Sequence, residues 1–261
     1  MSSMGRARGR GAALAVAAMV AWAGPAQAED AGKAEPPVLR IVQPLGVEPG
    51  EEARLTIRGQ RLGTNGTVSA EGLKDVRVEW VGQGDAPGIN GFDAARVGDR
   101  KVEVKLTVPA GVAPGPNVAL VFRGTNGVSA PFRLMVVRKG LLAGEKEPND
   151  GFRDAPGAPV PVVLRGGFAT KGDVDVFRVN LPEGRRLRAE VMAERLGSTL
   201  DATCAVYDAG KALVASVDDT VGRDPVVEFE AKRGGDYFVV VGYVNDQAAP
   251  THEYLLFLTQ P

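Results

Sequence analysis

Short stretches in which hydrophobic and polar residues alternate run through most of the chain and predict β-strands. In residues 101–108 four aliphatic side chains fall on one side of an extended backbone, and the polar side chains fall on the other. Residues 187–191 alternate in the same way, whereas residues 237–241 and 254–258 are almost continuously apolar, as expected of strands covered on both faces. Turn signals rich in Asn, Gly and Pro separate these runs. The pattern predicts an all-β protein built of antiparallel β-sandwiches.

The alternation is interrupted once, after residue 138, where "RKGLLAGEKEPND" introduces glycine and charge. We therefore predict two β-sandwich domains in series, over residues 37–138 and 148–261, joined by a linker at 139–147. Residues 29–36 carry no strand pattern and are expected to form a flexible tail.

The first 28 residues have the features of a secretory signal peptide. Arg6, Arg8 and Arg10 form a positive segment, residues 12–23 are mostly apolar, and Ala26-Gln27-Ala28 supplies the small-x-small cleavage pattern. The apolar run is short for a membrane span. We expect an exported protein, periplasmic or extracellular, that is not inserted in a membrane.

Charge and cysteine content limit the remaining possibilities. Removing the signal peptide would take three positive charges from a chain whose formal net charge is −1, leaving −4. A mildly acidic protein is not expected to bind nucleic acid or an anionic membrane through bulk electrostatics. Cys204 is the only cysteine, so no intrachain disulfide can form, and stability must come from a packed core or from bound metal.

Turn and strand residues in the first predicted domain carry a family resemblance. The stretch "LRIVQPLGVEPGEEARLTIRGQRLG" (39–63), the Pro114-Gly115 turn and "GVSAP" (127–131) resemble the Ig-like TIG/IPT modules. The resemblance implies a spacer or an interaction platform without chemistry of its own. Two copies of "GTNG", at 63–66 and 124–127, are interpreted as Asn-Gly hairpin turns, not as a repeat.

The second predicted domain has a more specific order of features. "EKEPND" (145–150) is followed by "GDVDVF" (172–177), a hairpin at "AVYDAG" (205–210), "GDYF" (235–238) and a closing "HEYLLFLTQ" (252–260). This succession resembles the bacterial pre-peptidase C-terminal domain family, which is related to the collagen-binding domains of secreted collagenases. The resemblance implies a jelly-roll-like β-sandwich appended to secreted proteins.

Acidic residues in two of these segments suggest a metal site. Pro148 favours an extended conformation for the residue before it, and residues i and i+2 of an extended chain point to the same side. Ca²⁺ requires six to eight oxygen ligands, more than one hexapeptide supplies, so both segments would contribute. By resemblance to calcium-binding relatives we predict a structural Ca²⁺ site formed by Glu145, Glu147, Asn149, Asp150, Asp173 and Asp175. The alternative is that these acids only form a solvated linker and a turn, or that the motif is a latch capping backbone groups.

Catalytic residues are scarce. His252 is the only histidine and stands near no nucleophile motif, while Cys204 lies within a predicted strand as a core residue. We therefore expect no enzymatic activity. The chain's tyrosines, Tyr207, Tyr237, Tyr243 and Tyr254, are either core residues or part of an aromatic binding face.

These observations predict a secreted, non-enzymatic binding protein, monomeric, with a calcium-stabilised β-sandwich that engages an extracellular protein or polysaccharide of matrix, envelope or polymer type. The alternative is an accessory protein that assists the secretion or folding of a partner peptidase.

Overall fold

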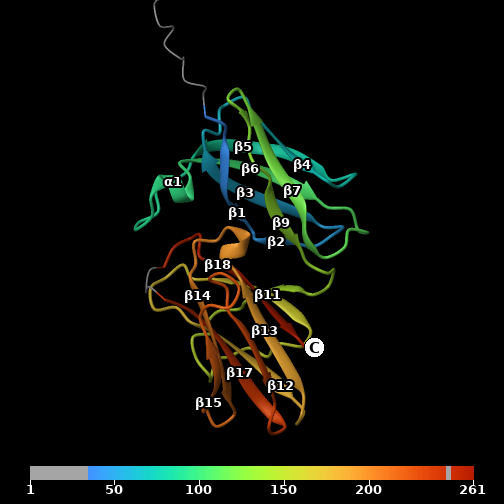
Figure 1. The fold of residues 1–261 in the computed structure, drawn as a ribbon, viewed down its shortest axis with the longest axis vertical. Helices are drawn as coiled ribbons and strands as arrows, with labels where there is room; N and C mark the ends of the chain where they lie inside the picture. Colours follow the sequence, from blue (N-terminus) through green and yellow to red (C-terminus); the bar gives the residue numbers. More distant parts are fainter. Residues whose placement is uncertain (1–34, 245–247) are drawn as a thin grey trace, which may run out of the picture. The chain divides into compact units, whose positions relative to one another are not determined.

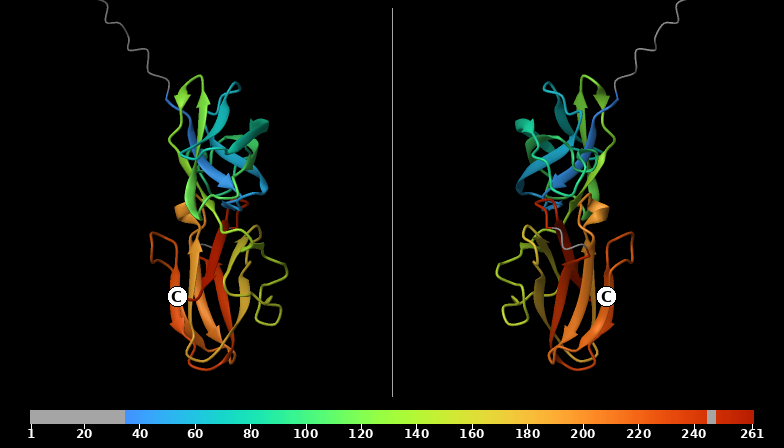
Figure 2. Two further views of the ribbon diagram at one scale, coloured as in Figure 1. Left: turned by 90° about the vertical axis from the view of Figure 1, so that its right-hand side faces the viewer. Right: turned by 90° about the vertical axis from the view of Figure 1, so that its left-hand side faces the viewer.

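A computed structural model of the chain describes residues 35–244 and 248–261. The predicted signal peptide, and all of the predicted tail except residues 35 and 36, lie outside the described residues. Figures 1 and 2 show the described chain as two successive groups of strands, the first coloured blue to green and the second yellow to red.

The first group of strands forms two sheets that face one another. One sheet has the order β1-β3-β6-β5, and the other has the order β2-β9-β7-β4 with β8 beside β7. The strands are β1 (Val38–Gln43), β2 (Gly46–Val47), β3 (Glu52–Gln60), β4 (Thr67–Glu71), β5 (Arg77–Asp85), β6 (Arg100–Thr107), β7 (Gly115–Gly124), β8 (Gly127–Val128) and β9 (Phe132–Val136). A short helix, α1 (Ala94–Val97), precedes β6.

The core of this first sandwich follows from the alternation seen in the sequence. Val102, Val104 and Leu106 of β6 are fully buried, as expected for the apolar side of a half-exposed strand. They pack with Leu55 and Ile57 of β3 and with side chains of the opposite sheet.

The second group of strands forms a second pair of sheets, with the orders β10-β11-β18-β13-β16 and β12-β17-β14-β15. The strands are β10 (Leu142–Gly144), β11 (Val162–Gly167), β12 (Asp175–Leu181), β13 (Arg186–Met192), β14 (Ala202–Asp208), β15 (Leu213–Val217), β16 (Val226–Glu230), β17 (Gly235–Tyr243) and β18 (Glu253–Thr259). A 3-10 turn, η1 (Glu194–Leu196), follows β13.

The position of β18 in the fold explains why its sequence is almost continuously apolar. Tyr254, Leu256 and Leu258 belong to the core between the two sheets of the second sandwich. Leu255 points the other way, into a smaller cluster that also contains Leu45 and Met135 of the first sandwich. Both faces of this strand are therefore covered by hydrophobic side chains.

The predicted all-β class with antiparallel β-sandwiches is confirmed, with three differences in detail. Strands β2 and β9 pair in parallel, as do β10 and β11. The Asn65-Gly66 turn does not close a hairpin, because β3 and β4 lie in different sheets, whereas Gly124 and Gly127 do pair across the second turn. Within the predicted linker, Leu142–Gly144 forms β10, which pairs with β11.

Among the described residues, no helix has the length and apolar character that crossing a membrane would require.

Candidate metal site

The first acidic side chain of the site is positioned by the edge of a sheet. Glu145 directly follows β10, and its backbone N–H donates to the carbonyl of Arg165 at 2.9 Å. Its Oε1 accepts a hydrogen bond of 3.0 Å from the backbone N–H of Gly167. Its Oε2 is buried and has no hydrogen-bond partner among the described residues. One oxygen of this carboxylate is therefore fixed by the backbone, and the other is free to bind a ligand.

The residues after it turn inward. The Glu147–Pro148 peptide bond is cis, and Oε2 of Glu147 accepts a hydrogen bond of 3.0 Å from the backbone N–H of Asn149. Asn149 is fully buried, and its backbone carbonyl accepts from Val176 N–H at 2.9 Å. Neither atom of its side-chain amide has a hydrogen-bond partner in the part of the chain that the structure describes. Since buried polar groups are nearly always paired, this amide is available to bind a ligand.

Asp175, the first residue of β12, supplies the third carboxylate and has no exposed surface. Its Oδ2 accepts a hydrogen bond of 2.6 Å from the phenol of Tyr254, while no described residue forms a hydrogen bond with its Oδ1. Gly166 makes room for this arrangement. A Cβ there would lie 2.4 Å from both Glu145 Oε2 and the Tyr254 hydroxyl.

The three carboxylates converge. Glu145, Glu147 and Asp175 each place one oxygen within 4.8 Å of the others. Oxygens at 2.3–2.6 Å around a single Ca²⁺ lie at most about 5 Å apart, so one hard cation can touch all three. Asn149 stands two residues after Glu147, and its backbone carbonyl is bonded to Val176, the residue after Asp175. Its unpaired amide oxygen is a type of ligand that Ca²⁺ accepts beside carboxylates.

Burial and mutual repulsion disfavour the ionised form of the carboxyl groups in and beside the cluster. Burial, followed by the negative charge of Glu145, raises the pKa of Asp175 to about 8. Burial raises the pKa of Glu145 as well. The pKa of Asp173 is raised to about 6, first by burial and then by the charges of Asp175, Glu147 and Asp150. A bound cation would reverse this destabilisation of the ionised carboxylates.

The six residues predicted from the sequence therefore differ in whether they lie in the cluster. Glu145, Glu147 and Asp175 form one group, and Asn149 is buried beside it. Asp150 is exposed and Asp173 is half-buried, and both lie outside the group of three, although their charges reach it. Sequence reasoning missed Tyr254 as the hydrogen-bond donor to Asp175. The only signal for it was the polar hydroxyl in an otherwise apolar strand.

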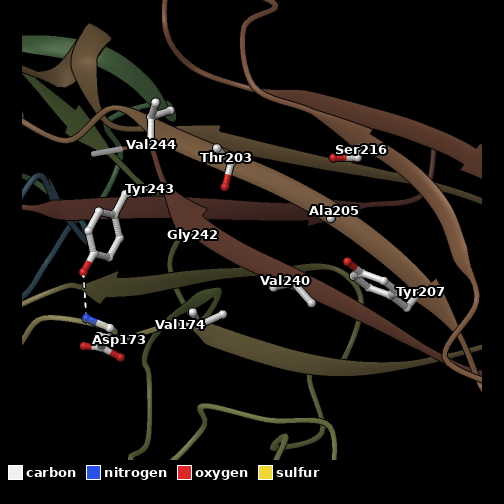
Figure 3. Close-up of a pocket in the computed structure, with 11 residues that line it drawn as sticks. Asp173, Val174, Thr203, Ala205, Tyr207, Ser216, Val240, Gly242, Tyr243 and Val244 are labelled. Carbon is white, nitrogen blue, oxygen red and sulfur yellow. Dashed lines mark hydrogen bonds between the residues drawn. The ribbon is translucent and has the colours of Figure 1, made fainter. Parts of the chain in front are cut away.

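A groove adjoins this cluster on the outer face of the sheet β12-β17-β14-β15, with a volume of about 500 Å³. Figure 3 shows Tyr243 near one end and Tyr207 toward the other, with small side chains between them. The Tyr243 hydroxyl accepts a hydrogen bond of 3.1 Å from Gly172 N–H, next to Asp173, which also lines the groove. The remaining lining residues are Val174, Thr203, Ala205, Ser216, Val240, Gly242 and Val244.

The four tyrosines divide between core and groove. Tyr254 and Tyr237 are buried, the first with no exposed surface, so neither belongs to a surface patch. Tyr207 and Tyr243 are partly exposed and line the groove. A surface face made by all four tyrosines is therefore ruled out.

Cys204 is fully buried, and burial raises the pKa of its thiol to about 12. It is a core residue of the second sandwich.

No family model matches the sequence, and no curated protein matches it. Among solved structures, the pre-peptidase C-terminal domain of a collagenase from Bacillus anthracis is similar at 15% identity and a TM-score of 0.35, over 44% of this chain and 100% of that one. A periplasmic inhibitor of g-type lysozyme from Aeromonas hydrophila is similar at 14% identity and a TM-score of 0.33, over 46% of this chain and 97% of that one. A mixed-linkage glucan-utilisation protein from Bacteroides ovatus, solved with a heptasaccharide, is similar at 10% identity and a TM-score of 0.19, over 82% of this chain and 72% of that one. At these identities and TM-scores, function has to be argued from the residues of this chain.

Proposed function

We propose that this protein is an exported, non-enzymatic binding protein whose second sandwich is stabilised by Ca²⁺ and binds an extended protein or polysaccharide chain. The features at residues 1–28 support export, because a positive segment, an apolar run and a small-x-small site occur in the order that signal peptidase requires.

One observation carries the proposal: Asp173 lines the groove and stands two residues before Asp175 of the acidic cluster, although it lies outside the group of three carboxylates. The pKa of Asp173 responds to the charges of Asp175 and Glu147 in the acidic cluster. A cation bound by the cluster would therefore fix the Gly172–Asp173 turn at one end of the groove. Calcium would order the binding surface without contacting the bound chain.

The groove has the features that suit an extended polymer. Small residues such as Ala205 and Gly242 leave the sheet surface open between two tyrosine rings. Tyrosine provides a flat apolar surface with a polar tip at little conformational cost, as sugar rings and peptide backbones both require. The groove is open along the sheet, so a long chain can lie across it.

The calcium part is tested by thermal unfolding in Ca²⁺ and in chelator. A ligand at 100 times its dissociation constant stabilises the folded state by about 2.7 kcal/mol, which is a measurable rise in Tm. Glu147→Gln removes an exposed ligand without disturbing the core and should abolish most of that rise. Asp218→Asn is the matched control, because Asp218 is an exposed acid after β15 that is not part of the acidic cluster, and it should keep the full rise. An equal Tm in Ca²⁺ and in chelator would refute the calcium site.

The binding part is tested by screening the protein on arrays of glycans and matrix proteins, with and without Ca²⁺. Ser216→Arg places a long side chain in the groove and should abolish any specific signal. Ser69→Arg, on strand β4 of the first sandwich, should leave it intact. A signal that survives Ser216→Arg would assign binding to another surface.

A further inference from the structure

A second, smaller cavity is lined by His252 and by none of the three clustered carboxylates. Its volume is about 100 Å³. It is polar and is lined by side chains of both sandwiches. These are Phe92, Arg96, Thr199, Asp201, Arg223, Tyr243 and His252, together with Gly91.

His252 is the side chain of this cavity whose polar atoms are buried without hydrogen bonds. It is 5% exposed, and among residues 35–244 and 248–261 neither ring nitrogen has a hydrogen-bond partner. Phe92 and Tyr243 contact the ring edge-on, with centroid distances of 5.6 and 6.2 Å. Aromatic neighbours hold the imidazole in place but cannot satisfy its nitrogens. A buried imidazole without partners costs free energy unless a ligand supplies the hydrogen bonds.

The charges around the cavity favour an anion. The guanidinium of Arg96 lies over the Phe92 ring, 5.2 Å from its centroid, and takes part in no ion pair among the described residues. Arg223 approaches Asp201 at 3.4 Å. Among the described residues that line the cavity, two guanidinium groups and one carboxylate carry charge, which leaves a net positive charge beside the imidazole. Guanidinium groups bind carboxylates and phosphates through two parallel hydrogen bonds.

The backbone on both sides of the cavity is held in place. Arg58, itself buried, donates hydrogen bonds to the carbonyls of Pro87, Val97 and Gly98, and so fixes the segment that carries Phe92 and Arg96. On the other side, His252 donates its backbone N–H to Ala249 at 2.9 Å, and its carbonyl accepts from Phe168 N–H at 2.9 Å. The site is therefore preorganised before any ligand arrives.

We propose that this cavity binds a small oxyanion, a carboxylate or a phosphate group, through the guanidinium groups of Arg96 and Arg223 and one nitrogen of His252. The imidazole donates its N–H to an anion oxygen, and the guanidinium groups neutralise the charge. Because the lining comes from both sandwiches, the bound anion links them. The cavity shares Tyr243 with the groove, and none of Glu145, Glu147 and Asp175 lines it.

The sole histidine makes the test direct. In protein without a histidine tag, in calcium-free buffer, the imidazole gives a single set of nuclear magnetic resonance signals, those of His252. Inorganic phosphate and acetate are titrated separately, with chloride at matched ionic strength as the reference. We expect a saturable shift of the His252 signals with phosphate, with acetate or with both, and none with chloride. The responding anion identifies the ligand chemistry.

Arg96→Gln is the decisive variant, because Arg96 is exposed and its loss leaves the core intact. Losing one charged hydrogen-bond partner should weaken binding about 10-fold or more. Arg185→Gln, an exposed arginine that is not part of the cavity lining, removes the same charge and should leave the affinity unchanged. The proposal is overturned if neither anion gives a saturable shift, or if the two variants bind equally well.

Discussion

The phenol of Tyr254 donates a 2.6 Å hydrogen bond to Oδ2 of Asp175, and both side chains are fully buried. The bond joins β18 to β12, which lie in the two different sheets of the second sandwich. It fixes the direction of the Asp175 carboxylate and leaves Oδ1 for the acidic cluster. Tyr254 therefore acts as a positioning residue for the candidate metal site.

Tyr254→Phe should destabilise the calcium-free protein. The substitution leaves Oδ2 of a buried carboxyl group without its donor, which costs about 1–3 kcal/mol. In urea unfolding, the midpoint should fall while the slope stays unchanged. Tyr207→Phe is the control, because the Tyr207 hydroxyl lines the open groove, and it should change the stability by less than about 0.5 kcal/mol. Equal losses in the two variants would mean that the Asp175 contact contributes nothing specific.

Asn149→Leu separates a metal ligand from a merely structural residue. An orphaned buried amide stabilises nothing without its ligand, so an apolar side chain of similar volume should leave the calcium-free stability equal or higher. The same variant should lose the rise in Tm on adding Ca²⁺. Asn117→Leu, which removes hydrogen bonds to the carbonyls of Ala113 and Pro114 in the first sandwich, should keep that rise. A strongly destabilised Asn149→Leu that still responds to Ca²⁺ would contradict a ligand role.

Glu253 should make stability depend on pH. Its Oε2 accepts a hydrogen bond of 3.0 Å from Leu45 N–H, and burial raises its pKa to about 7, against the opposing effects of Arg165 and of that bond. The folded state thus holds a proton that the unfolded state releases near pH 4.5. The free energy of unfolding should therefore fall as pH rises from about 4.5 to 7, by up to about 3 kcal/mol from this group.

The measurement for Glu253 is urea unfolding of the wild type and of Glu253→Gln at pH 5 and at pH 7.5. The amide mimics the protonated acid. The free energy of unfolding of the variant, relative to that of the wild type, should therefore be higher at pH 7.5 than at pH 5. Glu183→Gln, at an exposed turn, should follow the wild type at both values. A wild-type-to-variant difference that does not change with pH would show that Glu253 is charged in the folded state throughout.

Cys204 should be unreactive until the protein unfolds. Its thiol is fully buried in β14, and burial raises its pKa to about 12, so almost no thiolate forms near neutral pH. A thiol reagent should label the native protein only at the rate of global opening and should label the urea-unfolded protein at once. Rapid labelling of the native form would show that the second sandwich opens locally around β14.

The strands were predictable because alternation and turn residues are local properties of the sequence. The apolar sides of β6 and β13 are buried as the pattern requires. The prediction of a hairpin at Asn65-Gly66 was wrong because the partner of a strand is not a local property of the sequence. Whether a turn joins neighbours in one sheet or crosses to the facing sheet depends on contacts with strands far away in the sequence, and no local pattern records them.

The candidate site shows the same division. By itself the sequence determined that acids at 145–150 and 173–175 stand before strands at positions where two segments can meet. Only the tertiary structure decided which of them converge: Glu145, Glu147 and Asp175 do, while Asp150 stays exposed. It also supplied Tyr254 and the orphaned Asn149, and it surrounded His252 with Arg96 and Arg223. Residue type and spacing are properties of the sequence. Burial and side-chain direction are decided only when distant strands pack, because they depend on which residues cover each side chain.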